Sequence, residues 1–530
     1  MYRCKGTITV FLSLISMLFL SLFCTMAESA RVQGARFQAA AAFDMGLFSM
    51  FGEYDKVLLE EYDLWFLDST YGNRAFSTDA MEARLWYFIS PNIHPSEGIS
   101  AKDCWHLFPT ELDECSVDKY ALATDDGGQV FYKQVVENEK ELLAGNTISA
   151  MRKNMDEIRR QEISGEQYER EERAADENLQ KEIEKQRELE AKEANQTPQS
   201  QNKQGDGNAQ KDQTSDYEAG KDVQMNAENP LEKIKRLKRL GILSLVMKDS
   251  SQISDKKMSI SSLPSKRVLK KGNLNVRTEA AGVSGELAFL EYLKNHFTCA
   301  VDKEKKKIKE HALTYELEYI IAGKTSDAEN LKKVVNKLLL LREGVNYVCI
   351  CGSASMKEEA LALAAAIAGA AAVPALISAF QKAIMLAWAY GESILDVRSL
   401  LAGGKIPAVK TEADWKLSLE KLGDLEDIWE GCDGEKEKGR TYQEYLTGIL
   451  ALEQKKTRNM RTLDLIEANR RIEAGGENFR VDALVVRLEA HAVFELAPVF
   501  LAVPAVWMNL LNQGTAYQIK GGYGYMEGGV

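Results

Sequence analysis

Residues 7–27 form an apolar run without a single charged side chain. An α-helix rises about 1.5 Å per residue, so a run of this length crosses a bilayer core of about 30 Å. Arg3 and Lys5 precede it in a short basic leader, residues 1–6. The sequence therefore predicts a transmembrane helix over residues 7–27, which constrains where the rest of the chain folds.

Two other interpretations of this segment stay open. A secretory signal would be cut before Glu28, after the small residues Thr25 and Ala27, although the apolar core of such signals usually has only about 7–15 residues. A prepilin-type leader would end at Gly6, and its processing would make Thr7 the new N-terminus. The interpretations differ in whether the apolar helix stays on the mature chain.

The helical pattern continues past residue 27, and no proline occurs before Pro91. One helical face carries small and apolar residues at steps of three and four, namely Val32, Ala35, Ala39, Ala42, Phe43, Gly46 and Met50. We expect one helix over residues 7–51, with its first half in lipid and its second half packed on a soluble domain. Small or polar residues are expected to contact neighbouring helices in the bilayer: Gly6, Ser13, Ser16, Ser21 and Thr25.

The orientation of this helix is weakly specified by charge. Arg3 and Lys5 lie before the apolar run, whereas Arg31 and Arg36 lie after it. The positive-inside rule therefore does not clearly favour either end of the helix as the cytoplasmic one. Because only five residues precede Gly6, we expect the N-terminus in the cytoplasm. The protein would then be a single-pass protein of the cell membrane with an extracytoplasmic body.

The periodicity of the remaining chain predicts a helix-dominated α+β fold. Residues 28–150 are expected to form an α+β region, residues 151–229 a charged helix and a disordered linker, and residues 230–530 a mainly helical domain with a few strands. The α+β region is expected to contain a strand over 64–67, a helix over 78–89, a strand over 117–124, a turn over 125–128 and a helix over 130–143.

Residues 151–193 are dense in charge and hold no heptad, so we expect a solvated helix rather than a coiled coil. The polar segment 195–229 is expected to be the linker. Residues 231–240 form a basic amphipathic helix, which we expect to dock its apolar stripe on the core rather than on an anionic membrane. Further elements are expected as helices from residue 282, over 327–342, from residue 394 to Gly403 and over 442–471, and as strands within 481–503 and 517–525.

Residues 360–380 carry no charge and must be weighed as a second membrane span. They are mostly alanine, which contributes little to membrane insertion, and Pro374 interrupts them. We favour a buried helical hairpin, and a polytopic membrane protein is the alternative.

The composition argues against several classes of function. A net charge of −12 argues against nucleic-acid binding, and with five histidines a multi-histidine metal site is not expected. No cofactor and no small-molecule substrate are indicated. Cys104 and Cys115 flank a short loop and are candidates for a disulfide if this region is exported, whereas Cys349 and Cys351 are expected to be buried apolar side chains.

No group of residues indicates catalysis, so we expect a non-enzymatic protein. Gly323-Lys324-Thr325 imitates the end of a phosphate-binding loop, but Glu318 stands where that loop needs its first glycine. Asp125-Asp126-Gly127-Gly128 is expected to be a turn rather than a cation site. Glu392, Asp396 and Arg398 are interpreted as ordinary surface or helix-cap pairs.

The segments that carry a family resemblance are residues 5–14 and 28–36 at the start of the chain, followed by residues 54–71, 123–128, 317–324, 388–393 and 396–407. They extend over almost the whole chain outside the linker and resemble an uncharacterised bacterial family with pilin-like N-termini that is associated with Flp/Tad (tight adherence) pilus systems. The start of the chain is similar to that of TadE-type pseudopilins. Phe11 stands where pseudopilins usually carry a glutamate, so a permanently anchored accessory subunit fits as well as a processed filament subunit.

The resemblance implies a pilin-like region over residues 28–150 and a role in assembly or adhesion. We therefore expect a membrane-anchored, surface-exposed component of a Flp/Tad-type pilus or secretion assembly. Its expected partners are the membrane, other pilin-like subunits and proteins of the assembly platform. The alternatives are a secreted, signal-cleaved binding protein and the polytopic protein described above.

Overall fold

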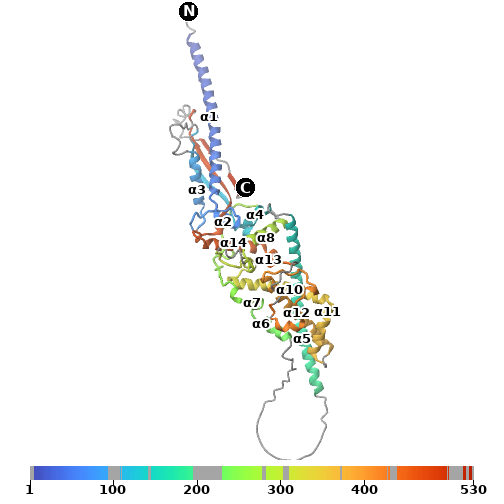
Figure 1. Ribbon diagram of the computed structural model, residues 1–530. Coiled ribbons are helices and arrows are strands. Elements are labelled where there is room, and N and C mark those ends of the chain that lie inside the picture. The colour runs from blue at the N-terminus through green and yellow to red at the C-terminus, as the bar shows by residue number, and fades with distance from the viewer. Residues whose placement is uncertain are drawn as a thin grey trace, which may run out of the picture. The chain divides into compact units, whose positions relative to one another are not determined.

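The computed structural model is helix-dominated and of the α+β class, which confirms the expected fold class (Figure 1). It describes residues 5–73, 75–93, 108, 110–140, 145–194, 230–276, 282–302, 310–369, 373–425, 428–429, 439–497, 499–500, 517–520 and 524–527. The expected linker over residues 195–229 lies outside these residues.

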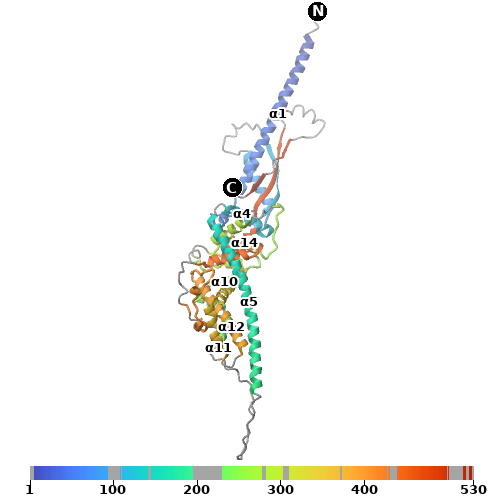
Figure 2. The same cartoon turned by 90° about the vertical axis from the view of Figure 1, so that its right-hand side faces the viewer.

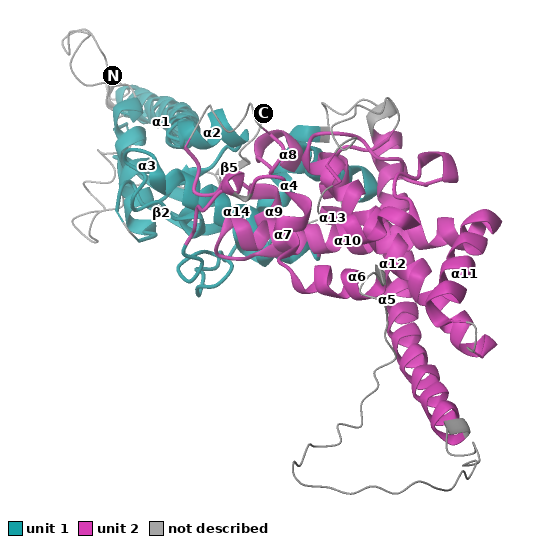
Figure 3. Ribbon diagram, turned by 60° about the horizontal axis from the view of Figure 1, so that its bottom comes forward, with its two compact units in different colours: residues 1–142, 259–292, 454–530 teal, residues 143–258, 293–453 magenta. Residues whose placement is uncertain are grey.

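The chain divides into two compact units, each built from separate stretches of sequence (Figure 3). Unit 1 comprises residues 1–142, 259–292 and 454–530, and unit 2 comprises residues 143–258 and 293–453. The boundaries expected near residues 150 and 230 therefore do not separate the compact units, because both units are completed by segments far apart in the sequence.

The N-terminal helix α1 spans Lys5–Phe51 as one unbroken element (Figure 2). Its second half buries the face that the sequence indicates, with Ala35, Ala39 and Met50 completely shielded from solvent. It packs on α3 (Thr78–Ile93) so closely that a Cβ at Gly46 would lie 2.6 Å from Ile89 Cγ1. The helix expected over residues 7–51 is thus confirmed.

A small antiparallel sheet forms the other side of this core. Strand β3 (Leu484–Leu496) is central and pairs along its length with β2 (Thr110–Leu122). Its other edge pairs in turn with three short strands, β1 (Leu67–Asp68), β5 (Gly524–Glu527) and β4 (Tyr517–Lys520). Apolar residues of α1, α3, β2 and β3 share one core cluster.

Two strands of unit 1 differ from the expectation. The strand expected over residues 64–67 is reduced to β1, because Asp63 adopts a left-handed conformation as the C-cap of α2 (Lys56–Tyr62) and Leu64 donates to the carbonyl of Leu58. Strand β2 begins seven residues before the expected strand over 117–124. A register shift against β3 between Leu112 and Glu114 interrupts the alternation of side chains in the first half of β2, so the sequence pattern did not indicate this half.

The remaining elements of unit 1 surround an aromatic cluster. Phe131 of α4 (Asp125–Lys140) packs edge-on against Phe289 of α8 (Gly282–His296). Helix α14 (Lys455–Ile472) packs on α4. The turn expected over residues 125–128 is confirmed by left-handed backbone at Asp126, Gly127 and Gly128.

Unit 2 is a helical bundle centred on α5 (Gly145–Ala194), α10 (Asp327–Gly352) and α12 (Pro374–Leu401). The other elements are α6 (Pro230–Arg239), α7 (Ile242–Val246), α9 (Glu316–Ala322), α11 (Ala354–Ala368), α13 (Tyr442–Leu452) and short 3-10 turns at Ser250–Gln252, Glu412–Asp414 and Leu419–Asp424. The helix expected over residues 442–471 is in fact two helices, α13 and α14, which are separated by extended backbone at Glu453 and Gln454.

The charged helix α5 is not wholly solvated. Ile158, Tyr168 and Leu179 are buried on one face, and this face packs on α10 through glycines from both helices. A Cβ at Gly165 would lie 2.6 Å from the carbonyl oxygen of Leu340, and one at Gly344 would lie 2.4 Å from the amide nitrogen of Gly165. The expectation of a solvated helix is therefore wrong for this face. It rested on the absence of a heptad repeat, but a helix can bury one apolar stripe without such a repeat.

One other prediction for unit 2 agrees with the structure, and a second agrees in part. Helix α6 buries its apolar stripe of Leu231, Ile234 and Leu237 against the bundle, as the docking interpretation expects. The hairpin expected over residues 360–380 is present, since α11 and α12 pack on each other. It is only partly buried, because Ala360 and Ala364 are buried whereas Leu361, Ala365 and Ala366 are exposed.

Candidate functional site

The first candidate site is the exposed half of α1. Among the described residues, Thr7–Phe51 is the one helix long and apolar enough to cross a membrane, and none of its most apolar window is buried. Gly6 and Thr7 lie in the first turn of this helix. The remaining predicted contact residues, Ser13, Ser16, Ser21 and Thr25, are all exposed.

Two hydroxyl groups of this half are satisfied within the helix itself. Ser13 Oγ donates to the carbonyl of Val10 at 2.8 Å, and Thr25 Oγ1 donates to the carbonyl of Ser21 at 2.7 Å. Such bonds let hydroxyl side chains lie in an environment that offers no water. The side chains of Ser13 and Thr25 are therefore compatible with lipid.

A buried ion pair marks the end of the apolar run. Glu28 and Arg31 are 2% and 5% exposed, and Arg31 Nη2 lies 2.7 Å from Glu28 Oε1. Glu28 also accepts the N–H of Phe500, and Arg31 donates to the carbonyl of Ala497, both just after β3. Burial acts to raise the pKa of Glu28, but Arg31 and the backbone donors outweigh it and lower this pKa. The pair ties α1 to the segment that follows β3.

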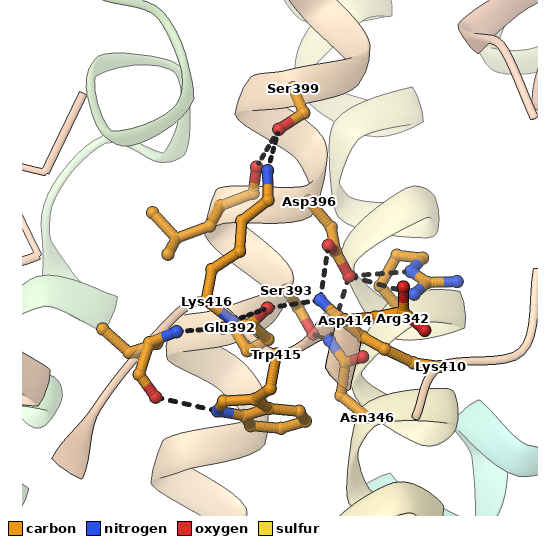
Figure 4. A network of polar contacts seen from close by, with 12 residues as sticks. Arg342, Asn346, Glu392, Ser393, Asp396, Ser399, Lys410, Asp414, Trp415 and Lys416 are labelled. Carbon is orange, nitrogen blue, oxygen red and sulfur yellow. Dashed lines mark hydrogen bonds and ion pairs between the residues drawn. The ribbon is translucent and has the colours of Figure 1, made fainter. Parts of the chain in front are cut away.

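A second candidate site lies inside unit 2, where Lys410 sits between two carboxylates of α12 (Figure 4). Lys410 Nζ donates to Asp396 Oδ1 at 2.7 Å and also bonds Glu392 Oε1. The three side chains are at most 1% exposed. Glu392 and Asp396 are one helical turn apart, so one ammonium reaches both.

Helix α10 supplies the countercharge for the second carboxylate. Arg342 Nε and Asn346 Nδ2 donate to Asp396 Oδ2 at 3.0 and 3.2 Å. Arg342 Nη1 also donates to the hydroxyl of Tyr445 on α13 and to the carbonyl of Pro407, each at 3.1 Å. The network therefore joins α10, α12, α13 and the segment after α12.

The two carboxylates of this network differ in environment. Burial acts to raise the pKa of Asp396, but the charges of Lys410 and Arg342 outweigh it and lower this pKa to about 2. Burial and the neighbouring Asp396 raise the pKa of Glu392, although Lys410 opposes them. Asp396 is thus held as an anion, whereas the carboxyl of Glu392 retains a proton more readily.

The interpretation of Glu392, Asp396 and Arg398 as surface or helix-cap chemistry is wrong. Arg398 is 2% exposed and donates to the carbonyls of Leu245, Leu425 and Ile428. The position of these charges could have indicated their burial. They interrupt the long, mainly apolar helix α12, and the residues before and after them on this helix are buried. A charge in that position must be paired.

A groove of about 510 Å³ adjoins this network in unit 2. It is lined by Gln161 of α5, by Val348 and Cys349 of α10 and by residues 408–412. Cys349 is half-buried and Cys351 is exposed, so the expectation that both thiols are buried is wrong.

The remaining sequence candidates form no site. Gly323 is the left-handed C-cap of α9, and the Lys324 N–H donates to Asn330 Oδ1 at 2.8 Å, so the Gly-Lys-Thr run closes a helix rather than a phosphate loop. Asp125 accepts the N–H groups of Leu122 and Gly272. Cys115 lies on β2, but Cys104 lies outside the described residues, so their disulfide stays a prediction.

Glu343 of α10 makes the stability of unit 2 depend on pH. Burial raises its pKa to about 7 from the ordinary 4.5, with Lys238 opposing and Glu172 adding to the shift. Above pH 4.5 the unfolded chain loses this proton and the folded chain keeps it until about pH 7, so stability falls across this window and then levels. Glu343→Gln is expected to remove this loss of stability. Above pH 7 the variant should be more stable than the unaltered protein by about 3 kcal/mol. Denaturant unfolding at pH 4 and pH 8 measures the difference in free energy of unfolding between the two proteins. An equal difference at both pH values would contradict the assignment of the pH dependence to Glu343.

Residues 220–496 match a family of unknown function, DUF5702. The match covers more than half of the chain, and the chain therefore belongs to this family. No curated protein and no solved structure matches the chain.

Proposed function

We propose that this protein is a membrane-anchored, non-enzymatic component of a Flp/Tad-type pilus or secretion assembly, either a pseudopilin-like subunit or an accessory one. The observation that supports the proposal is α1, whose first half is apolar and exposed and whose second half forms part of the core of an α+β unit. One continuous helix thus couples an anchor to a folded body, as in the pilin-like proteins that the N-terminal sequence resembles.

The course of α1 favours a retained anchor over a cleaved secretory signal. The helix continues without a break through Ala27 and Glu28, and Glu28 is buried in the folded unit. A polytopic protein is supported less, because α11 has only 15 residues and carries three charged ones, Lys357, Glu358 and Glu359, near its start. A single membrane span is the arrangement that we adopt.

Lateral partners are supported by the outward face of α1. Phe37, Met45 and Phe48 follow the anchor on this helix and are 79%, 54% and 70% exposed. Large apolar side chains in such positions are typical of interaction surfaces. Together with the exposed anchor half, they offer a helical face to other pilin-like subunits or to platform proteins.

The proposal places the body of the protein outside the cytoplasm. Cys351 is the exposed cysteine among the described residues. In intact cells, a membrane-impermeant maleimide is therefore expected to label the full-length protein at Cys351. The measurement is mass spectrometry of the labelled peptide.

Cys351→Ser is the matched control and should lose this label, while other thiols keep theirs. Labelling of Cys351 only after the cells are lysed would place the body in the cytoplasm. That result would overturn both the orientation and the proposed surface role.

A further inference from the structure

The Lys410 network brings an amine and a carboxyl group into contact inside the protein. Lys410 Nζ bonds Glu392 Oε1, and both side chains are at most 1% exposed. Two backbone donors hold the carboxyl group in place, since the N–H of Leu417 lies 2.8 Å from Oε2 and the N–H of Lys416 lies 3.1 Å from Oε1. Amide groups in this position stabilise an oxyanion that forms on the same carbon.

The geometry points to an intramolecular isopeptide bond between Lys410 Nζ and Glu392 Cδ, formed by the folded protein itself. The site excludes water, and two groups in fixed contact react with effective molarities of about 10⁵–10⁸ M. Burial and the neighbouring Asp396 carboxylate raise the pKa of Glu392, and the protonated acid is the form of this group that condenses with an amine.

The reaction balances without any further reactant. Lys410 passes one proton to Glu392, and the neutral Nζ attacks Cδ to give a tetrahedral intermediate. The proton left on nitrogen moves to the departing hydroxyl through the Asp396 carboxylate, which lies 2.7 Å from Nζ. The C–N bond forms, the C–O bond breaks and one water leaves, with no oxidation or reduction.

The surroundings offer partners to the polar groups of the product. The amide N–H would donate to Asp396, and if Oε1 is the oxygen that leaves as water, the remaining oxygen would accept from the backbone N–H of Leu417. Asp396 would keep its ion pair with Arg342, whose Nη2 lies 3.0 Å from Asp396 Oδ2. One buried ion pair, with its desolvation cost, would thus be replaced by a neutral hydrogen-bonded group.

Trypsin digestion of the full-length protein purified in detergent tests this inference. Cleavage after Lys382, Arg398, Lys405 and Lys416 is expected to release residues 383–398 joined to residues 406–416. Residues 406–416 stay in one peptide because Lys410, once acylated, is no longer a cleavage site. The joined species should weigh one water less than the two peptides together, because the condensation releases one water. Fragment ions should place the bond between Lys410 and Glu392.

Recovery of residues 406–410 and 411–416 as separate unmodified peptides would overturn the inference, and so would a bond to Asp396 instead of Glu392. These results need only the unaltered protein, so they do not depend on the folding of any variant. Lys410→Arg keeps the positive charge and should abolish the joined species, whereas Lys416→Arg, at the neighbouring lysine, should retain the bond. Glu392→Gln should give the same joined product with loss of ammonia in place of water.

Discussion

Leu14→Arg is expected to abolish retention of the protein in the membrane. Leu14 lies near the middle of the apolar half of α1 and is 60% exposed, so no protein contact shields a charge there. An arginine at the centre of a spanning helix costs about 2.5–3.5 kcal/mol, and the favourable contribution of leucine is lost as well. Fractionation of cells into membrane and soluble extracts, followed by detection of the full-length chain, measures the effect.

Phe37→Arg is the matched control for this experiment. It places the same charge on the same helix at a residue that is 79% exposed beyond the apolar run, and retention should be unchanged. The N-terminus of the retained protein completes the test, since Met1 indicates an intact anchor and Thr7 a processed leader. A mature start at Glu28, or normal retention of Leu14→Arg, would contradict the anchor.

The N-terminal helix α1 could be predicted because its signal is local. Length, absence of charge and a small-residue face are all read from consecutive residues, and the structure keeps them in one element over Lys5–Phe51. The same holds for α6, whose apolar stripe of Leu231, Ile234 and Leu237 docks as its spacing indicates. Periodicity was sufficient for these two helices, whereas the single buried face of the densely charged α5 was not predicted.

The candidate site of unit 2 could not be predicted in this way, because it depends on pairings between distant segments. Arg342 and Asp396 are 54 residues apart in sequence, and Lys410 joins them from an irregular segment. Each residue taken alone is typical of a surface. Only the buried flanks of α12 indicate otherwise, and no spacing rule identifies which cation will pair with which carboxylate. The division into two units could not be predicted for the same reason, because each unit combines stretches that are far apart in the sequence.

Asp396→Ala is expected to destabilise unit 2 by about 3–5 kcal/mol, because it leaves Arg342 buried without its carboxylate partner. Arg342 is fully buried, and its remaining partners are the hydroxyl of Tyr445 and the carbonyl of Pro407. Such a loss is a large share of the stability of a typical domain. Denaturant unfolding followed by tryptophan fluorescence measures the change, because Trp415 lies beside Lys410 and Trp388 packs on Trp415.

Two variants show whether the loss comes from an unpaired charge rather than from general disturbance. Arg170→Ala breaks the solvent-exposed pair with Glu166 in the same unit and should change stability little. The double variant Arg342→Met with Asp396→Leu removes both charges and should recover much of the stability lost in Asp396→Ala, since well-packed apolar residues can replace a buried ion pair. If the double variant is less stable than Asp396→Ala, the cost lies in lost packing and bonds to Tyr445 and Pro407, and the charge-based account of the network fails.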